Sequence, residues 1–146
     1  MIKQVINSLD APAALGPYSQ GIRAGHTVYL SGQLGLDPKT GNLADGIDAQ
    51  THQVFQNLRA VALAAGGKLD DMVKLTILMA NLGDFAQVNE IMKGYFAEPY
   101  PARATYQVAA LPKAALIEIE GVLELTPPPV DPQTESHEAV KQMKGE

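Results

Sequence analysis

The sequence predicts a single α+β domain in which two helices pack on one face of a largely antiparallel sheet. The chain has 146 residues, the length of one domain, and 46% of them are apolar, enough to form a buried core. Segments with strand and helix periodicity alternate in the order β-β-β-α-β-α-β-β, which forms two layers around one core. After Thr126 the chain becomes proline-rich and polar, so we expect a folded domain at residues 1–126 and a tail at 127–146.

The first half of the domain contains three predicted strands and one helix. Residues 3–7 predict a short strand, and residues 22–24 and 27–30 predict a hairpin around the Gly25-His26 turn. A turn-rich stretch at residues 35–46 leads to a helix that we expect Asp48 to cap and Gly66-Gly67 to end. The apolar residues that recur there with helical spacing are Val54, Leu58, Val61 and Ala65.

The second half supplies a strand, a helix and a final pair of strands. One set of alternating apolar residues predicts a strand with a buried face: Val73, Leu75, Ile77 and Met79. Asp84 and Gln87 resemble a capping box ahead of an amphipathic helix that Pro99 and Pro101 end. The apolar residues of that helix are Phe85, Val88, Met92, and Tyr95 or Phe96. Residues 102–108 and 115–125 then predict two strands joined by a turn around Leu111-Pro112-Lys113.

The last two strands, paired as a hairpin, would gather polar side chains on one sheet face. If the turn centres near Pro112, Thr105 lies opposite Glu118 and Arg103 lies opposite Glu120. Arg103 would then either form a structural salt bridge with Glu120 or clamp a ligand carboxylate, for which the planar guanidinium is suited.

The face that carries the glutamates is only partly polar. Glu118, Glu120 and Glu124 alternate with apolar residues, yet Leu116 and Val122 share their face. Glu124 on this face is most simply a solvated charge. A half-apolar second face indicates a sheet that another subunit covers, so we expect an oligomer.

Composition and charge argue against several classes of function. Lysine and arginine total 11 against 16 acidic residues, a net charge of −5 that disfavours binding to nucleic acid. Cysteine is absent, which excludes disulfides, thiolate nucleophiles and cysteine-ligated metals. His26, His52 and His137 have no metal-binding or triad spacing, so we expect no metal. With no apolar run of about 20 residues and no signal-like start, we expect a cytoplasmic protein without membrane contact.

Two glycine-containing segments and one helical asparagine are candidate ligand contacts. Residues 16–21, GPYSQG, form a rigid loop that presents Tyr18, which could instead simply pack on the domain. Ser31 and Gly32 follow a strand within SGQLG, where glycine permits close approach of a ligand to the backbone. Asn89 lies in the second predicted helix, where exposure explains its polarity as well as function does.

Taken together, these segments resemble the Rid family, also called YjgF or translation-inhibitor-like proteins. The resemblance runs in order from Ala11 to Leu125, and the PAR…LPK…IEIE ending is its most specific part. The segments that carry it are APAALGPYSQGI, YLSGQLGLDP, AQTHQVFQNLRAVALAAGG, MVKLTILMANLGDFAQVNE and EPYPARATYQVAALPKAALIEIEG.

This resemblance implies a fold, an assembly and an activity. The fold is chorismate-mutase-like, and the assembly is a homotrimer with clefts between neighbouring subunits. The activity is hydrolysis of reactive enamines and imines to 2-keto acids and ammonia, with 2-aminoacrylate, 2-iminopropanoate and 2-iminobutanoate as substrates. It needs neither a cofactor nor a metal.

The resemblance also assigns roles to individual residues. Arg103 matches the arginine that grips the substrate carboxylate, and Glu118 matches the glutamate near the attacking water. Tyr18 matches an aromatic residue that closes the cleft from the neighbouring subunit. The remaining matches are substrate contacts at Ser31, Gly32 and Asn89.

Thr105 departs from the family pattern, which commonly has cysteine there. Chemistry that depends on a thiol is therefore excluded, while a hydroxyl can still bond the substrate nitrogen or a water. Imine hydrolysis needs no thiol, so the departure leaves the deaminase interpretation open.

Two other functions remain open at this point. The same Arg103 site could hold a small carboxylate in a regulatory module without turnover. The family is also described as endoribonucleases or translation inhibitors, an activity that the net charge of −5 and the few arginines disfavour.

Overall fold

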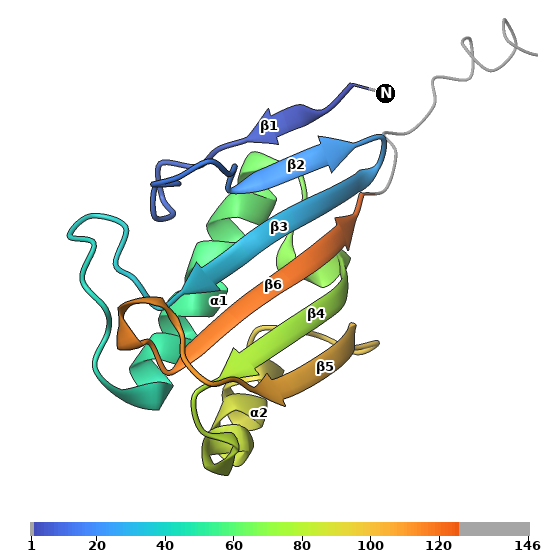
Figure 1. Cartoon of the computed structure of the whole chain (residues 1–146). Coiled ribbons are helices and arrows are strands. Elements are labelled where there is room, and N and C mark those ends of the chain that lie inside the picture. Colours follow the sequence, from blue (N-terminus) through green and yellow to red (C-terminus); the bar gives the residue numbers. More distant parts are fainter. Residues whose placement is uncertain (1, 126–146) are drawn as a thin grey trace, which may run out of the picture.

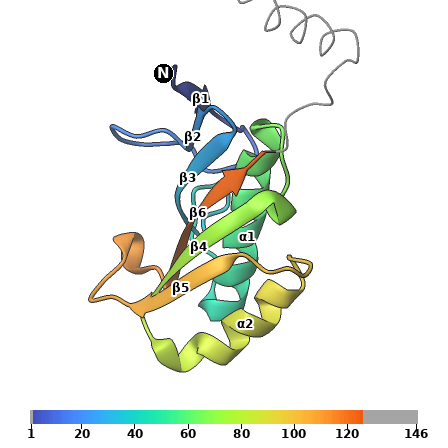
Figure 2. The same cartoon turned by 90° about the vertical axis from the view of Figure 1, so that its right-hand side faces the viewer.

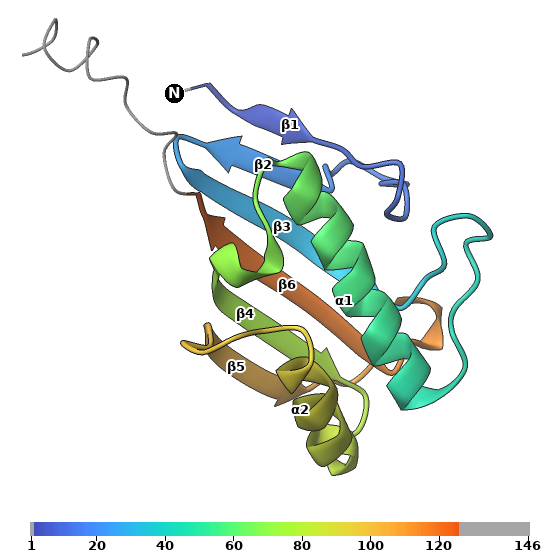
Figure 3. The same cartoon turned by 180° about the vertical axis from the view of Figure 1, so that it is seen from behind.

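The computed structural model describes residues 2–125 and contains one sheet covered by helices on one face. Residues 127–146, where we expect a tail, lie outside the described residues. The sheet order is β1-β2-β3-β6-β4-β5 (Figure 1), and the strands are β1 (Gln4–Ile6), β2 (Gly21–Ala24), β3 (Thr27–Leu34), β4 (Met72–Met79), β5 (Ala102–Gln107) and β6 (Ile117–Glu124). The helices are α1 (Gly46–Ala64) and α2 (Phe85–Lys93), and Figures 2 and 3 show both on the same face. The predicted α+β class is confirmed.

Helix α1 forms the centre of the core. The side chains of Val54, Leu58 and Val61 are fully buried against the sheet, as their spacing predicts. Gly66, at φ +88°, ends the helix as expected, but α1 begins at Gly46 with Asp45 as its N-cap, so the prediction of Asp48 as the cap is wrong. Asp48 instead lies in the first turn, where its negative charge interacts favourably with the positive end of the helix dipole.

Two details of the second half also differ from the prediction. Val73 is 49% exposed because the β4–β6 register shifts between Met72 and Lys74, and Met72 takes the buried place instead. The capping box is wrong as well: Asp84 is the N-cap of α2, but its side chain makes no capping hydrogen bond. The turn before α2 is capped by Asn81, whose side chain accepts from the Gly83 amide at 2.8 Å.

The pairing of β5 is the main correction to the predicted fold. β5 runs parallel to β4 at the edge of the sheet, and β6 lies on the other side of β4. The unit β4–α2–β5 is a crossover through a helix, and such connections join parallel strands. β6 is apolar on its helix-facing side and inserts between β3 and β4, where that side is buried. The hairpin expected between residues 102–108 and 115–125 therefore does not form.

This pairing separates the polar residues that the hairpin would have gathered. Arg103 pairs with Leu75, which is fully buried under the helices, so Arg103 lies on the helix-covered face. Glu118 pairs with Leu78 and lies on the opposite, open face. Thr105 is not opposite Glu118, and Arg103 is not opposite Glu120, because β4 stands between them.

Candidate functional site

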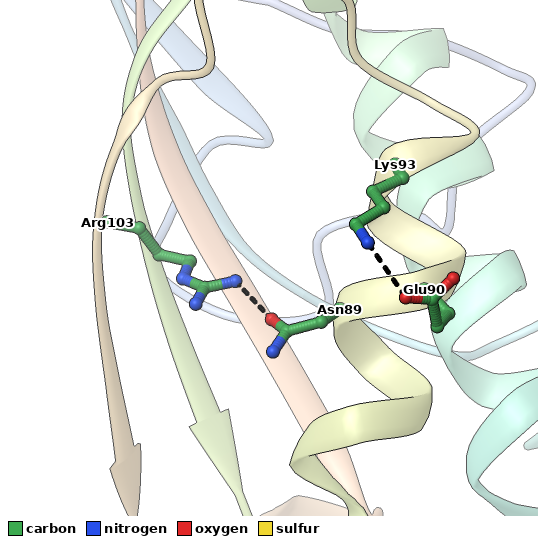
Figure 4. A network of polar contacts seen from close by, with 4 residues as sticks. All are labelled: Asn89, Glu90, Lys93 and Arg103. Carbon is green, nitrogen blue, oxygen red and sulfur yellow. Dashed lines mark hydrogen bonds and ion pairs between the residues drawn. The ribbon is translucent and has the colours of Figure 1, made fainter.

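Arg103 contacts three side chains of α2. Its Nη1 donates to Oδ1 of Asn89 at 2.6 Å (Figure 4) and approaches the sulfur of Met92 at 3.6 Å. Its guanidinium carbon lies 5.2 Å from the centre of the Phe85 ring, within range of a cation–π interaction. Since Nη1 is engaged on this side, Nε and Nη2 form the edge that remains for a planar anion such as a carboxylate.

The groove beside Arg103 is mixed in character. It has a volume of about 630 Å³ and is lined by Ala86, Asn89, Glu90, Met92, Lys93, Tyr100, Pro101 and Arg103. Lys93 and Glu90 pair with each other at 2.8 Å on the exposed side of α2 (Figure 4). That pair raises the pKa of Lys93, first through the hydrogen bond to Glu90. Among residues 2–125 it is the single salt bridge, so the expected alternative of an Arg103–Glu120 salt bridge is wrong.

Thr105 lies two residues after Arg103 on the same face of β5. Its hydroxyl oxygen is buried and is the one buried side-chain polar atom of residues 2–125 without a hydrogen-bond partner. An unsatisfied buried hydroxyl carries a desolvation cost, which a ligand atom or a water can relieve.

Glu118 lines a second cleft, at the end of the sheet where β3 ends and β6 begins. The β1–β2, β3–α1 and β5–β6 connections lie at that end (Figure 1) and contribute residues to the cleft. The cleft has a volume of about 480 Å³, and its polar and charged lining includes Tyr18, Ser31, Lys113, Glu118 and Glu120. The sheet itself thus supplies the carboxylates, and the loops supply the walls.

The environment of Glu118 disfavours its charged form. Partial burial raises the pKa of the Glu118 carboxyl, and the nearby Glu120 carboxylate raises it further. A carboxyl group in a cleft whose pKa is raised binds a proton more readily than an ordinary glutamate, which suits a general base or acid.

Gly32 permits the position of the Glu118 carboxylate. Residues 31 and 32 lie where the β3–β6 register shifts, between Leu30 and Gln33. A Cβ atom on Gly32 would overlap Oε1 of Glu118 and lie 3.0 Å from its Cδ, so a side chain there would displace the carboxylate. Because Gly32 has no side chain, it leaves the space that the Glu118 carboxylate occupies.

The side chain of Ser31 is hydrogen-bonded within the chain, whereas the side chain of Tyr18 is exposed. The Ser31 hydroxyl donates to the carbonyl of Ser19, and its amide donates to the carbonyl of Gln20 at 3.0 Å. Ser31 thus fixes the loop that carries Tyr18. The Tyr18 side chain is 56% exposed at the cleft and remains available to a ligand or to another surface.

The predicted site residues therefore fall into two groups in one chain. Asn89, Arg103 and Thr105 lie on the helix-covered side at one edge of the sheet, and we call them the arginine group. Tyr18, Ser31, Gly32 and Glu118 line the cleft at the other side, and we call them the glutamate group. Each group contains one of the two candidate catalytic residues, Arg103 or Glu118.

The sequence patterns did not assign to the site three residues that lie beside the two groups: Phe85, Met92 and Lys113. Phe85 and Met92 lie four residues before and three residues after Asn89, so helical periodicity could have placed all three beside Arg103. Lys113 lines the glutamate cleft from a turn in which it adopts φ 57°, a left-handed conformation that sequence does not signal for lysine.

The described residues contain no cluster of three or more histidine, aspartate or glutamate side chains that could hold a metal ion. Within the same residues, neither helix has the length and apolarity needed to cross a membrane.

Comparison with known proteins places these features in a family. The sequence model of the family described as Endoribonuclease L-PSP matches residues 8–124. The 2-iminobutanoate/2-iminopropanoate deaminase of Homo sapiens is 47% identical over 123 residues, which are 84% of this chain and 90% of the human protein. The crystal structure of RidA from an Antarctic Psychrobacter bacterium is 52% identical with a TM-score of 0.82 and covers 84% of this chain and 99% of its own. The structure of E. coli TdcF with bound serine is 37% identical with a TM-score of 0.81, with coverage of 84% and 99%.

Proposed function

The chain belongs to the Endoribonuclease L-PSP family, the Rid family that its motifs resemble, and we propose that it hydrolyses small 2-imino acids. The substrates would be 2-iminobutanoate, 2-iminopropanoate and the enamine 2-aminoacrylate that tautomerises to the latter. Water adds to the imine carbon, the carbon–nitrogen bond breaks, and a 2-keto acid and ammonia leave. The names of relatives such as the human deaminase support this proposal.

The observation that carries the proposal is that, within residues 2–125, the chain presents a guanidinium edge without a partner at one site and a carboxyl group of raised pKa at another. Arg103 would bind the substrate carboxylate through Nε and Nη2, since Nη1 is engaged by Asn89. Glu118 would take a proton from the attacking water and return one to the departing nitrogen. An imine carbon is already electrophilic, so orientation of water and substrate accounts for most of the required catalysis.

Tyr18 and Thr105 would complete the site. Tyr18, exposed at the glutamate cleft, would shield the imine from bulk water. The unpaired hydroxyl of Thr105 would bond the substrate nitrogen or a water in the place where family members commonly have cysteine.

We further propose that the working site forms between two copies in a homotrimer. In one chain, Arg103 and Glu118 lie on opposite faces of the sheet, so a second copy must bring a glutamate group to an arginine group. The open face supports such an assembly, because no helix covers it (Figure 2) and it exposes Tyr29 at 54% and Tyr106 at 58%. A cyclic trimer joins the two different groups at each of its interfaces.

Mixing two inactive variants tests both the activity and the sharing of the site. The assay couples a threonine dehydratase to this protein and measures the release of 2-ketobutyrate from 2-iminobutanoate. Arg103→Ala and Glu118→Gln should each be nearly inactive alone. After unfolding and refolding together in equal amounts, about a quarter of the interfaces should combine two intact groups and restore that share of activity. No recovery in verified mixed trimers would place the whole site in one chain.

Binding of a small carboxylate without turnover is the second candidate. The arginine group alone is sufficient for it, and the related TdcF structure contains bound serine. The coupled assay separates the two functions, because a binding module would leave the rate of keto-acid release unchanged.

A further inference from the structure

We infer that Gln20 is a positioning residue: its buried side chain holds residues 8–18 in the shape that forms one wall of the glutamate cleft. The inference rests on the proposed function of this cleft. It assigns a role to a residue that lines neither the arginine groove nor the glutamate cleft.

The side-chain amide of Gln20 makes several hydrogen bonds to the backbone of residues 8–12. The side chain is 2% exposed, and its Oε1 accepts from the Ser8 amide at 2.6 Å. Its Nε2 donates to the carbonyls of Pro12 at 2.8 Å and Ser8 at 3.1 Å, with a longer contact to Ala11 at 3.4 Å. One planar group thus satisfies backbone atoms on both sides of the bend at residues 8–12.

Little else holds this segment in place. Within residues 2–125, the hydrogen bonds that join residues 8–18 to the rest of the chain all end on the Gln20 side chain. Apolar burial contributes mainly through Ala11, since Leu15 is 85% exposed and Leu9 is 93% exposed. Pro12, Ala13, Leu15 and Tyr18, all from this segment, line the cleft beside Glu118.

The other end of the segment is fixed independently by Ser31. Its hydroxyl and amide bind the carbonyls of Ser19 and Gln20. If the Gln20 side chain were lost, Tyr18 would still be tethered at one end, while the wall at residues 12–15 would be free to move. A ligand would then have to order that wall on binding, which weakens binding more than it slows the chemical step.

Only a side-chain amide can both accept a hydrogen bond from the Ser8 amide and donate to the carbonyls of Ser8 and Pro12. Methionine has a similar length but neither a donor nor a strong acceptor. Glutamate keeps the acceptor for the Ser8 amide, but its second oxygen would face the three carbonyls and repel them unless it is protonated. Burial and these carbonyls would raise the pKa of that carboxyl, so the interaction would return as the pH falls.

The experiment compares Gln20→Met and Gln20→Glu with a control, Thr51→Val. Thr51 is fully buried in α1, where its hydroxyl donates to the carbonyl of Ile47 at 2.7 Å, and it lines neither the arginine groove nor the glutamate cleft. We expect Gln20→Met to raise KM for 2-iminobutanoate about tenfold, to change kcat less than about threefold, and to accelerate amide hydrogen exchange in residues 8–18. The control should leave both readouts unchanged. For Gln20→Glu, the ratio of its KM to that of the wild type should fall as the pH is lowered.

The outcomes separate this inference from the proposed function. Accelerated exchange with an unchanged KM would overturn the positioning role and leave the deaminase proposal intact. An inactive wild type would refute the deaminase proposal. The Kd of 2-ketobutyrate would then serve as the readout in place of KM. A tenfold weaker binding of 2-ketobutyrate by Gln20→Met would still support the inference. A wild type that neither hydrolyses the imine nor binds 2-ketobutyrate would overturn both.

Discussion

Replacing Gly32 with alanine should abolish most of the activity while leaving the fold intact. The new Cβ would overlap Oε1 of Glu118 and lie 3.0 Å from Cδ and 3.1 Å from Cγ. Carbon contacts are most favourable at about 3.5–4.0 Å, so the carboxylate must withdraw by about 1 Å. A displacement of that size costs roughly 10²-fold in rate, or about 2.7 kcal/mol of transition-state stabilisation.

The stability of this variant should change little. The atoms that must move belong to the far end of a flexible side chain that is only partly buried. Alanine in a strand gains about 0.5–1 kcal/mol over glycine in conformational entropy, which offsets a rotamer cost of similar size at Glu118. We expect a melting temperature within about 4 °C of the wild type.

Gly35→Ala is the matched control, because its Cβ would meet backbone instead. It would lie 2.7 Å from Cα and 2.8 Å from the carbonyl oxygen of Gln50, atoms that cannot rotate away. That variant should lose about 1–3 kcal/mol of stability. Kinetics and melting curves of both variants, with Gly32→Ala repeated in the Glu118→Gln background, form the assay. Full turnover in Gly32→Ala, or an undiminished effect of Gly32→Ala when Glu118 is already replaced, would refute the reasoning.

Three further predictions concern Arg103 and Glu118. Arg103→Lys should lose nearly as much kcat/KM as Arg103→Ala, about 30-fold to several-thousand-fold, because an ammonium cannot reproduce the guanidinium edge; both should melt like the wild type, and substantial rescue by lysine would contradict a bidentate clamp. Glu118→Gln should lower kcat by about 10²–10⁴-fold while the Kd of 2-ketobutyrate stays within about threefold; an unchanged kcat would make Glu118 structural. Since folding raises the pKa of Glu118, its ionisation destabilises the fold as the pH rises through that pKa. Glu118→Gln should therefore exceed the wild type in melting temperature at neutral pH, with the difference vanishing in acid, and a constant difference would contradict the raised pKa.

The sequence was a good guide to the elements and a poor one to the neighbours of β5. Alternation and helical spacing are local properties, so they located α1, α2 and the strands to within a few residues. Strand pairing is not local. The turn at residues 111–113 looked sufficient for a hairpin, but the helix between β4 and β5 makes those two strands parallel and adjacent.

The sequence predicted individual residues of the candidate site but not how they are placed relative to one another. The resemblance supplied the roles proposed for Arg103 and Glu118, and parity along each strand separated buried from exposed positions correctly on β6. Parity does not say which face of one strand matches which face of another until the pairing is known. Contacts across elements, such as Phe85 on Arg103 or Gln20 on Pro12, therefore lay beyond what spacing could predict.

The separation of Arg103 from Glu118 in one chain has a chemical advantage. If the two shared a face at hydrogen-bond distance, they would form an ion pair, which would occupy the guanidinium edge and lower the pKa of the carboxyl group. On opposite faces, Arg103 is held by the neutral Asn89, while burial and the like-charged Glu120 raise the pKa of Glu118 instead. In the proposed trimer the substrate carboxylate and imine would lie between them. Each group would then meet the part of the substrate it suits, and neither would be neutralised by the other.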